Sequence, residues 1–332
     1  MNIKKIGLSA LAGSLVAMSA SAEVTLSGGA SVTFTSTHDS DKTGYGMADS
    51  ITAKYSGETD GGLTVTTSLE LDGGANANSS FDSRSISIAS EDMGTITFSG
   101  HGGDTVMSGW DDMTPTAYEE VWAYSTVSSA TTASAGREAT FINGVDGNNL
   151  WRYDSPTFSG VSVHASYLQS PQTQSESAQA SVDAYSDFGI QVAPEALEGL
   201  TIGYAFGEVS ESATISNDES TLWVTYTNGP ISVGYQTSEV DGQTTTQDDE
   251  AVAYSISYAV TDDLSISYGV HEVDLGSATA ANSDQESSGF SASYTMGGVS
   301  ISLAMNETDN VGGQTAASSD IEGYDLNIAF AF

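Results

Sequence analysis

Apolar and small polar residues alternate along most of this 332-residue chain, and this period of two constrains the fold more than any other feature. Between Val252 and Val260, for example, the even positions hold Val, Tyr and Ile, and the odd positions hold Ala and Ser. Successive side chains of a β-strand point to opposite faces, so the pattern predicts strands with one apolar and one polar face. Beyond residue 22 the sequence has no helical period and no apolar run of the roughly 18 residues that a transmembrane helix needs.

The composition of the polar face favours a membrane barrel over a soluble β-sandwich. A soluble sheet presents long charged side chains such as Lys to water. Here the polar faces carry mainly Ser, Thr, Gly and Ala, and the whole chain has seven Lys and Arg against 44 Asp and Glu. Small polar side chains suit a crowded, watered interior, whereas Tyr, Phe, Leu and Val suit lipid. The sequence therefore predicts an all-β protein, a transmembrane antiparallel β-barrel.

Sixteen alternating segments can be distinguished, and the connections between them are short and long in turn. Short connections such as 58–61 and 157–159 alternate with long polar ones such as 37–49, 240–249 and 308–319. This alternation is typical of bacterial outer-membrane barrels, in which an even strand number returns both termini to the periplasmic side. Closure also removes the sheet edges, which lipid would not tolerate. The predicted strands are 24–36, 50–57, 62–72, 81–91, 94–101, 148–156, 160–169, 181–193, 199–208, 219–228, 230–238, 250–261, 263–273, 287–296, 298–307 and 320–332.

The first 22 residues are predicted to be a signal peptide. Two lysines at 4–5 precede an apolar run over 6–18, and Ala20-Ser21-Ala22 follows as an A-x-A cleavage site. The run is short and contains Gly and Ser, which disfavours the alternative of an N-terminal membrane helix. We therefore expect an exported protein in which residues 1–22 are removed and residues 23–332 form one barrel domain.

Composition and motifs exclude several other classes. The absence of Cys excludes disulfides and cysteine-built metal or redox sites. The scarcity of Lys and Arg excludes nucleic acid as a partner. The four His, at positions 38, 101, 164 and 271, are scattered, and sets of Ser, His and Asp can be drawn throughout so Ser-rich a chain. With no serine elbow, zinc-ligand pair or phosphate loop in a suitable context, we expect no enzymatic activity, no catalytic residue and no organic cofactor.

Four passages carry a resemblance to a known family. They are Glu23-Val24-Thr25-Leu26-Ser27-Gly28; Ser83-Arg84 with Gly94-Thr95-Ile96-Thr97-Phe98; the spaced residues Asn149, Tyr153, Ser155-Pro156, Phe158, Gly160 and Tyr167; and the final Phe332. In this order and spacing the chain resembles the sixteen-stranded general porins of Gram-negative bacteria, particularly their alphaproteobacterial, Rhodobacter-like branch. The resemblance implies a passive diffusion channel and a homotrimer in contact with outer-membrane lipid and lipopolysaccharide. It also implies that the barrel assembly machinery recognises Phe332.

The longest connection is the candidate functional site. About 46 residues separate His101 from Asn148, and a loop of this length without secondary structure is usually functional or disordered. Its aromatic residues argue against disorder, because they need something to pack on. In the porins that the chain resembles, this third loop folds into the barrel and narrows it, with loop acids facing bases on the wall; the alternative is an external loop packed over the mouth. The predicted constriction acids are Asp104, Asp111, Asp112, Glu119 and Glu120.

The predicted basic wall is sparse. Alternation points Lys54 and Arg152 to the polar face. Arg84 matches the family's eyelet arginine by position, yet it shares its parity with the apolar Ile86, so it requires a bulge, a change of face or a place at the strand end. Arg137 lies on the returning limb of the third loop, where local acids offer partners. The predicted bases of the pore wall are Lys54, Arg84, Arg137 and Arg152.

The expected function is a water-filled, cation-selective channel for passive diffusion of ions and small hydrophilic solutes, because acids greatly outnumber bases. Two alternatives remain open: a secreted or surface calcium-binding adhesin, whose nonapeptide repeat the chain lacks, and a structural barrel with a plugged lumen. Acids in or beside the long connections either form a solvated surface or bind Ca²⁺ or Mg²⁺; no metal ligand is assigned. These acids are Asp241, Asp248, Asp249, Glu250, Asp274, Asp284, Glu286, Glu307 and Asp309.

Overall fold

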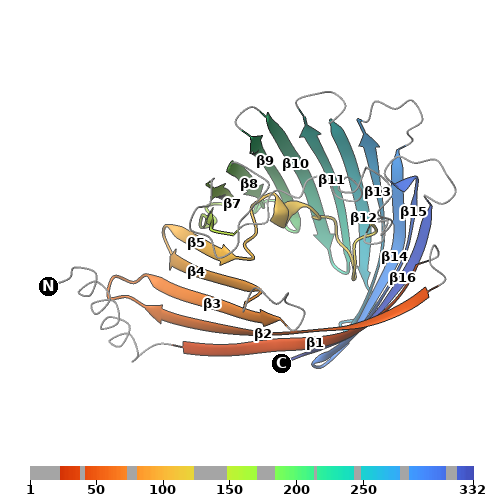
Figure 1. Cartoon of the computed structure of the whole chain (residues 1–332), viewed down its shortest axis with the longest axis horizontal. Coiled ribbons are helices and arrows are strands. Elements are labelled where there is room, and N and C mark those ends of the chain that lie inside the picture. The colour runs from red at the N-terminus through yellow and green to blue at the C-terminus, as the bar shows by residue number, and fades with distance from the viewer. Residues whose placement is uncertain are drawn as a thin grey trace.

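The computed structural model describes residues 23–37, 42–72, 81–122, 148–169, 184–212, 215–242, 248–276, 284–311 and 320–332. Sixteen antiparallel strands form one closed barrel, in which each strand lies beside its neighbours in sequence and β16 lies beside β1 (Figure 1). The predicted fold class and strand number are therefore confirmed, whereas the predicted signal peptide, 1–22, lies outside the described residues. The strands are β1 (Glu23–Thr37), β2 (Lys42–Glu58), β3 (Thr64–Asp72), β4 (Ser83–Ser90), β5 (Gly94–His101), β6 (Leu150–Asp154), β7 (Val161–Leu168), β8 (Ala184–Val192), β9 (Leu200–Ser212), β10 (Ile215–Asn228), β11 (Ile231–Asp241), β12 (Asp249–Ala259), β13 (Leu264–Leu275), β14 (Gln285–Met296), β15 (Val299–Asp309) and β16 (Ile321–Ala331).

The barrel closes between its first and last strands. The pairing of β1 with β16 begins at Gly29 opposite Ala331 and continues along both strands. Beyond it, Gly28 and Phe332 exchange two backbone hydrogen bonds: the Gly28 N–H donates over 3.2 Å and the Phe332 N–H over 3.0 Å. The seam gives the two terminal strands partners for their main-chain donors and acceptors, so neither is left as a free edge.

The two faces of the strands differ in exposure as the alternation predicts. In β12, Tyr254, Ile256 and Tyr258 are 41–47% exposed, whereas Ala251 and Ala253 on the opposite face are each 5% exposed. The exposed apolar residues recur on the neighbouring strands and make a belt far larger than the scattered apolar residues of a soluble surface. Such a belt needs an apolar environment such as lipid.

The short connections depend on glycines with left-handed backbone. Gly94, the first residue of β5, has a φ of 79°, and Gly199, just before β9, has a φ of 86°. A Cβ at these positions would collide with the carbonyl oxygens of Asp154 and Thr227 respectively. Both the dihedral angle and the close approach therefore require glycine.

The predicted boundaries are wrong at one long connection. The sequence predicts a polar loop over 37–49, but β2 begins at Lys42 and continues the pairing with β1, with Tyr45 opposite Phe34. Tyr45 and Met47 are 82% and 70% exposed and extend the apolar face. Two glycines obscure the alternation in this stretch, because Gly is uncommon in strands and has no side chain that would show which face of the strand it lies on. β9 and β10 also extend further than predicted.

Acidic side chains lie opposite one another at the long-loop ends of the strands, on the same face as the apolar belt. Asp218 of β10 lies opposite both Glu208 of β9 and Asp241 of β11, and all three are exposed. Like charges in directly opposed positions destabilise a sheet. The further acid pairs are Glu239–Glu250, Glu250–Asp274, Glu272–Glu286, Glu286–Asp309 and Glu307–Glu322.

Neutralising the central acid of this group should stabilise the barrel. We expect Asp218→Asn to raise the free energy of unfolding by about 0.2–1 kcal/mol at low ionic strength, and by less in high salt, because it removes two like-charge contacts. Chemical unfolding in detergent measures the change in the free energy of unfolding, with the electrophoretic shift distinguishing the folded from the unfolded form. The matched control is Asp262→Asn, in the short turn between β12 and β13. Equal behaviour of the two variants would contradict the proposed repulsion.

Candidate functional site

The third loop is described over residues 102–122, and this part follows the polar face of the wall. Near its start, the Val106 N–H donates to Ser166 Oγ of β7 over 3.0 Å. The Met107 N–H donates to Asp187 Oδ2 of β8 over 2.8 Å. Backbone groups that no secondary structure pairs are thus satisfied by polar side chains of two successive strands.

Gln236 of β11 holds the next part of the loop at two points. Its Oε1 accepts a hydrogen bond from the Met113 N–H, and its Nε2 donates to the Trp110 carbonyl, both over 2.7 Å. Gln236 is 2% exposed, so water does not compete for these bonds. The remaining bonds continue as far as β16: Ser255 Oγ to the Pro115 carbonyl (2.7 Å), the Ala117 N–H to Ser267 Oγ (2.9 Å), the Tyr118 N–H to Ser291 Oγ (3.1 Å), Asn306 Nδ2 to the Glu120 carbonyl (2.9 Å) and the Tyr118 hydroxyl to Asp325 Oδ1 (3.1 Å).

Apolar packing reinforces the start of the loop. Val106 is fully buried, Trp110 is 6% exposed, and both belong to a cluster with Trp223 of β10. The two indole rings meet edge to face, with centroids 5.5 Å apart, a geometry that aromatic pairs favour. At the other end of the described part, Val121 and Trp122 pack with Ala253 of β12. The loop is therefore held by both hydrogen bonds and apolar contacts.

Two glycines of the wall leave room for the loop. A Cβ on Gly189 of β8 would lie 2.7 Å from side-chain atoms of Val106 and Trp110, and a Cβ on Gly234 of β11 would collide with Pro115. Glycine inside a strand often marks the close approach of another part of the chain. At both positions a larger residue would push the loop away from the wall.

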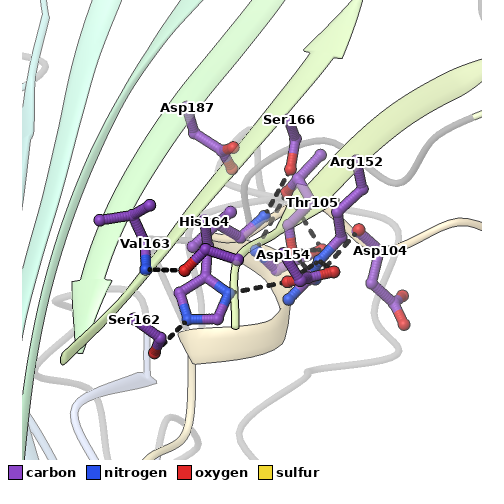
Figure 2. Close-up of polar contacts among 12 residues, drawn as sticks. Asp104, Thr105, Arg152, Asp154, Ser162, Val163, His164, Ser166 and Asp187 are labelled. Atoms are coloured by element: carbon purple, nitrogen blue, oxygen red, sulfur yellow. Dashed lines mark hydrogen bonds and ion pairs between the residues drawn. The ribbon is translucent and has the colours of Figure 1, made fainter. Parts of the chain in front are cut away.

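Arg152 of β6 lies where the loop meets the wall (Figure 2). Its Nε donates to both carboxylate oxygens of Asp154, over 3.1 and 3.2 Å, and its NH1 donates to the carbonyls of Asp104 (3.3 Å) and Thr105 (3.0 Å). Asp154 Oδ1 also lies 2.7 Å from Nδ1 of His164, the residue directly opposite on β7. Arg152 therefore contacts the loop backbone and an acid of its own strand.

The same network contains Ser, His and Asp in the order of a hydrolase triad. Ser162 Oγ lies 3.0 Å from His164 Nε2, and the Asp154 carboxylate holds the other ring nitrogen. Ser162 is only 6% exposed, and the adjacent Val163 N–H already donates to Ser155 Oγ, so that amide is not free to stabilise an oxyanion. We interpret the three groups as structural support for the Asp154 carboxylate.

Three of the five predicted loop acids lie together. Asp111, Asp112 and Glu120 interact with one another, and burial raises all three pKa values, that of Asp111 to about 6 and that of Glu120 to about 7. Burial likewise raises the pKa of Glu119, and the neighbouring charge of Glu120 adds to the shift. Asp104 is separate: its backbone carbonyl binds Arg152, while its carboxylate points away from the guanidinium (Figure 2).

The predicted bases do not form one cluster. Lys54 is exposed on the polar face of β2, opposite Ser68 of β3. A bulge follows Arg84, which pairs with His101. Arg84 lies with Leu69, Ile86 and Phe98 around a hollow of about 270 Å³, on the apolar face. This geometry does not support Arg84 as a base of the pore wall, because its side chain lies with the residues that face lipid. Arg137 lies outside the described residues.

The wall residues that bind the loop are not predicted from the sequence. Asp187, Gln236, Asn306 and Asp325 are each 2–6% exposed and lie on the polar face. Their signal is weak: they are long polar side chains at positions that elsewhere hold Ser, Thr or Gly. No local pattern identifies Asp325 as the partner of the Tyr118 hydroxyl, because the two residues lie 207 positions apart.

The structure supplies no metal centre for the acids. Across the described ranges, no group of three or more His, Asp and Glu side chains is arranged to hold a metal ion. Asp248 and Asp249 instead accept backbone hydrogen bonds from Gly242 (3.1 Å) and Gly276 (3.0 Å). The hypothesis of Ca²⁺ or Mg²⁺ at the acidic connections stays a prediction. Within the same ranges, none of the helices has the length and hydropathy to cross a membrane.

Solved structures of porins share this fold. A porin refined at 1.8 Å resolution is 16% identical over 93% of this chain and 100% of its own, with a TM-score of 0.66. A variant of the Rhodobacter blastica porin is 15% identical over the same shares, with a TM-score of 0.63. A loop-deletion mutant of OmpT, an outer membrane protein of Vibrio cholerae, is 12% identical over 94% of this chain and 99% of its own, with a TM-score of 0.68. These values do not distinguish a Rhodobacter-like branch, which stays a prediction.

Sequence comparison decides the family. No curated protein sequence matches the chain. The model of the Gram-negative porin family, however, matches residues 7–331. This match covers nearly the whole chain and agrees with the closed sixteen-strand barrel. The chain belongs to the family of Gram-negative porins, the channel proteins of the outer membrane.

Proposed function

We propose that the chain forms a water-filled, cation-selective channel through which ions and small hydrophilic solutes diffuse passively, and that the third loop narrows it. One observation carries this proposal: residues 106–120 are bonded to the polar face of eight strands between β7 and β16, and the acids Asp111, Asp112 and Glu120 cluster on this part of the loop. A closed barrel with an apolar exterior has its polar face toward the lumen. A loop bound to that face occupies lumen volume.

The water path is proposed to lie between the loop and the wall formed by β1–β5. The polar face of these strands carries mainly hydroxyl groups, some of which pair with each other, as Ser56 and Thr66 do over 2.8 Å. Exposed Lys54 lies on this face, as do the acids Glu70 and Asp72. Hydroxyl groups offer donors and acceptors to a passing hydrated solute without binding it tightly.

The balance of charge supports a preference for cations. Arg152 is paired with Asp154, Arg84 lies on the apolar face, and Lys54 is an exposed base on the polar face of β2. Against it stand Asp111, Asp112 and Glu120 on the loop. Low-dielectric walls concentrate the field of such charges in a narrow channel.

Removal of the loop acids should lower the selectivity. We expect a cation-selective reversal potential across a KCl gradient for the wild type, and a clear shift toward zero for Asp111→Asn with Asp112→Asn. The matched control is Asp262→Asn with Asp263→Asn, an acid pair in a short turn. The effect should fade as salt rises, since the screening length is about 8 Å at physiological salt and about 3 Å at 1 M.

Each outcome of that measurement discriminates between explanations. Anion selectivity of the wild type would overturn the argument from charge. Equal shifts in the two double variants would overturn the proposed constriction and leave the barrel intact. A barrel that conducts no ions would favour the alternative of a plugged lumen.

The raised pKa values predict an unusual pH dependence of selectivity. A carboxyl group is charged above its pKa, so Glu120, with a pKa of about 7, and Asp111, with a pKa of about 6, lose charge as the pH falls from 8 to 5. Ordinary carboxylates, with pKa values of about 4, stay charged over this range. Cation selectivity should therefore decline between pH 8 and 5. Glu120→Gln with Asp111→Asn should flatten the curve; a wild-type selectivity that is constant over this range would contradict the assignment.

Export and assembly complete the proposal. A cleaved signal peptide over 1–22, a homotrimer in lipid and lipopolysaccharide, and recognition of Phe332 by the barrel assembly machinery are consistent with membership of the porin family. Phe332 offers both an exposed side chain, 72% accessible, and backbone bonds to Gly28 that complete the seam. Its loss would remove both.

Deletion of Phe332 should therefore reduce the amount of folded barrel in the outer membrane. The measurement is the quantity of the heat-modifiable form in outer-membrane fractions. Phe158→Ala is the control, because Phe158 is an exposed aromatic residue in a short turn and does not take part in the seam. A wild-type amount of the heat-modifiable form in the deletion strain would contradict this prediction.

A further inference from the structure

We infer that Arg152 is a positioning residue, which clamps the start of the third loop to the wall rather than supplying charge to the channel. The sequence predicts the other role, a wall base that faces the loop acids. The inference rests on the proposed function, because a clamp affects transport only if the loop narrows the channel.

The guanidinium joins two parts of the chain that lie about 50 residues apart in sequence. One edge binds the Asp154 carboxylate on its own strand through Nε. NH1 donates to two consecutive loop carbonyls, those of Asp104 and Thr105 (Figure 2). Arginine presents its donors in a fixed plane, so these bonds can form at the same time. A lysine ammonium is a compact charge on a flexible stem and does not reproduce this geometry.

Arg152 links the first turn of the loop to the wall. Thr105 is fully buried, and its carbonyl begins the single turn that leads into the short 3-10 helix Ser108–Trp110. Two donors to this carbonyl come from the turn itself, the Gly109 N–H over 3.1 Å and the Ser108 hydroxyl over 3.2 Å, and Arg152 is the donor from the wall. Removing the guanidinium leaves the turn its own bonds but takes away the bonds that tie the Asp104 and Thr105 carbonyls to β6.

Arg152 is also the first of three anchors on successive strands. It binds the carbonyls of Asp104 and Thr105 from β6, Ser166 binds the next N–H from β7, and Asp187 binds the one after that from β8. The anchors fix the path of the loop where it leaves the wall. Without the first anchor, the loop keeps its later bonds to the wall, but residues 104 and 105 lose theirs to β6.

The charge of Arg152 is compensated where it stands. The Asp154 carboxylate lies 3.1 Å from the guanidinium, and His164 fixes the orientation of that carboxylate at 2.7 Å. An ion pair at this distance acts on a passing ion as a dipole, and its field falls off faster than that of a single charge. The geometry thus favours a mechanical role over an electrostatic one.

The test compares Arg152→Lys and Arg152→Gln in planar bilayers at 1 M KCl, where screening over about 3 Å suppresses effects of charge. We expect both variants to lose the single conductance level of the wild type and to show sublevels, because neither side chain forms the clamp. Lys54→Gln is the matched control, an exposed base on the same face. It should keep the wild-type level at 1 M KCl and shift the reversal potential only in dilute salt.

Three results would overturn the inference. If Arg152→Lys behaves as wild type and Arg152→Gln shifts only the reversal potential in dilute salt, Arg152 acts by charge. If both variants match the wild type in every measurement, it has no role in transport. If the wild type itself does not conduct, the proposed function fails and the clamp fails with it. Should Arg152→Gln not fold, Arg152→Lys decides, because it keeps a cation beside Asp154.

Discussion

The seam between β1 and β16 is the interaction on which the rest of the structure depends. Lipid offers no partner to a backbone N–H or carbonyl, so a sheet can cross the outer membrane only if its first and last strands pair. Here the pairing extends to the last residue, because Gly28 and Phe332 exchange backbone bonds beyond the end of the regular ladder. Once the sheet is closed, the alternation of residues creates two separate environments, an apolar exterior and a polar interior.

The polar interior has a second consequence. Its side chains are mostly Ser, Thr and Gly, which are too short to fill a barrel of sixteen strands. We propose that the third loop occupies part of this space, and Gly189 and Gly234 of the wall leave room for its closest approaches. The bonds of the loop go to side chains of the wall, since the backbone of the wall is already used by the sheet. A few longer residues, such as Gln236 and Asp187, thus determine where the loop lies.

Acidic residues lie in two different environments in this structure. Burial against the wall raises the pKa values of Asp111 and Glu120. These acids therefore carry charge that responds to pH near neutrality. On the apolar face, the opposed acids around Asp218 have the contrary character: they are exposed, near water and screened by salt. Acidic residues on the loop are thus proposed to set the ion selectivity of the channel, whereas opposed acids on the apolar face are expected to lower the stability of the sheet.

Much of the fold follows from the sequence, because a period of two directly reports the faces of a strand. All sixteen strands can be located in this way, and only the glycine-rich start of β2 is badly misplaced. The loop acids can be nominated because they lie in one long connection. Their partners cannot, because the bonds join residues far apart in sequence, 80 positions for Met107 and Asp187 and 186 for Glu120 and Asn306.

Arg84 and Arg152 show how far the sequence predicts the position and the partners of a basic residue. Arg84 keeps its parity with Ile86 and lies on the apolar face, although the register with β5 shifts by one position beside it. Its expected place on the pore wall rests on the resemblance to the family's eyelet arginine, whereas the alternation itself puts it on the face of Ile86. Arg152 points as its parity predicts, but two of its partners are the loop carbonyls of Asp104 and Thr105, which no local sequence pattern identifies.

We propose that the third loop lies in the water path, and chemical modification of a single thiol on the loop tests this position. Because the chain lacks cysteine, Asp112→Cys introduces a single thiol on the loop, and a bulky water-soluble thiol reagent can be added while the conductance of open channels is recorded. Complete labelling should lower the conductance of every channel, whereas labelling of Asp262→Cys in a short turn should not. Unchanged conductance after complete labelling of Asp112→Cys would show that the loop lies outside the water path.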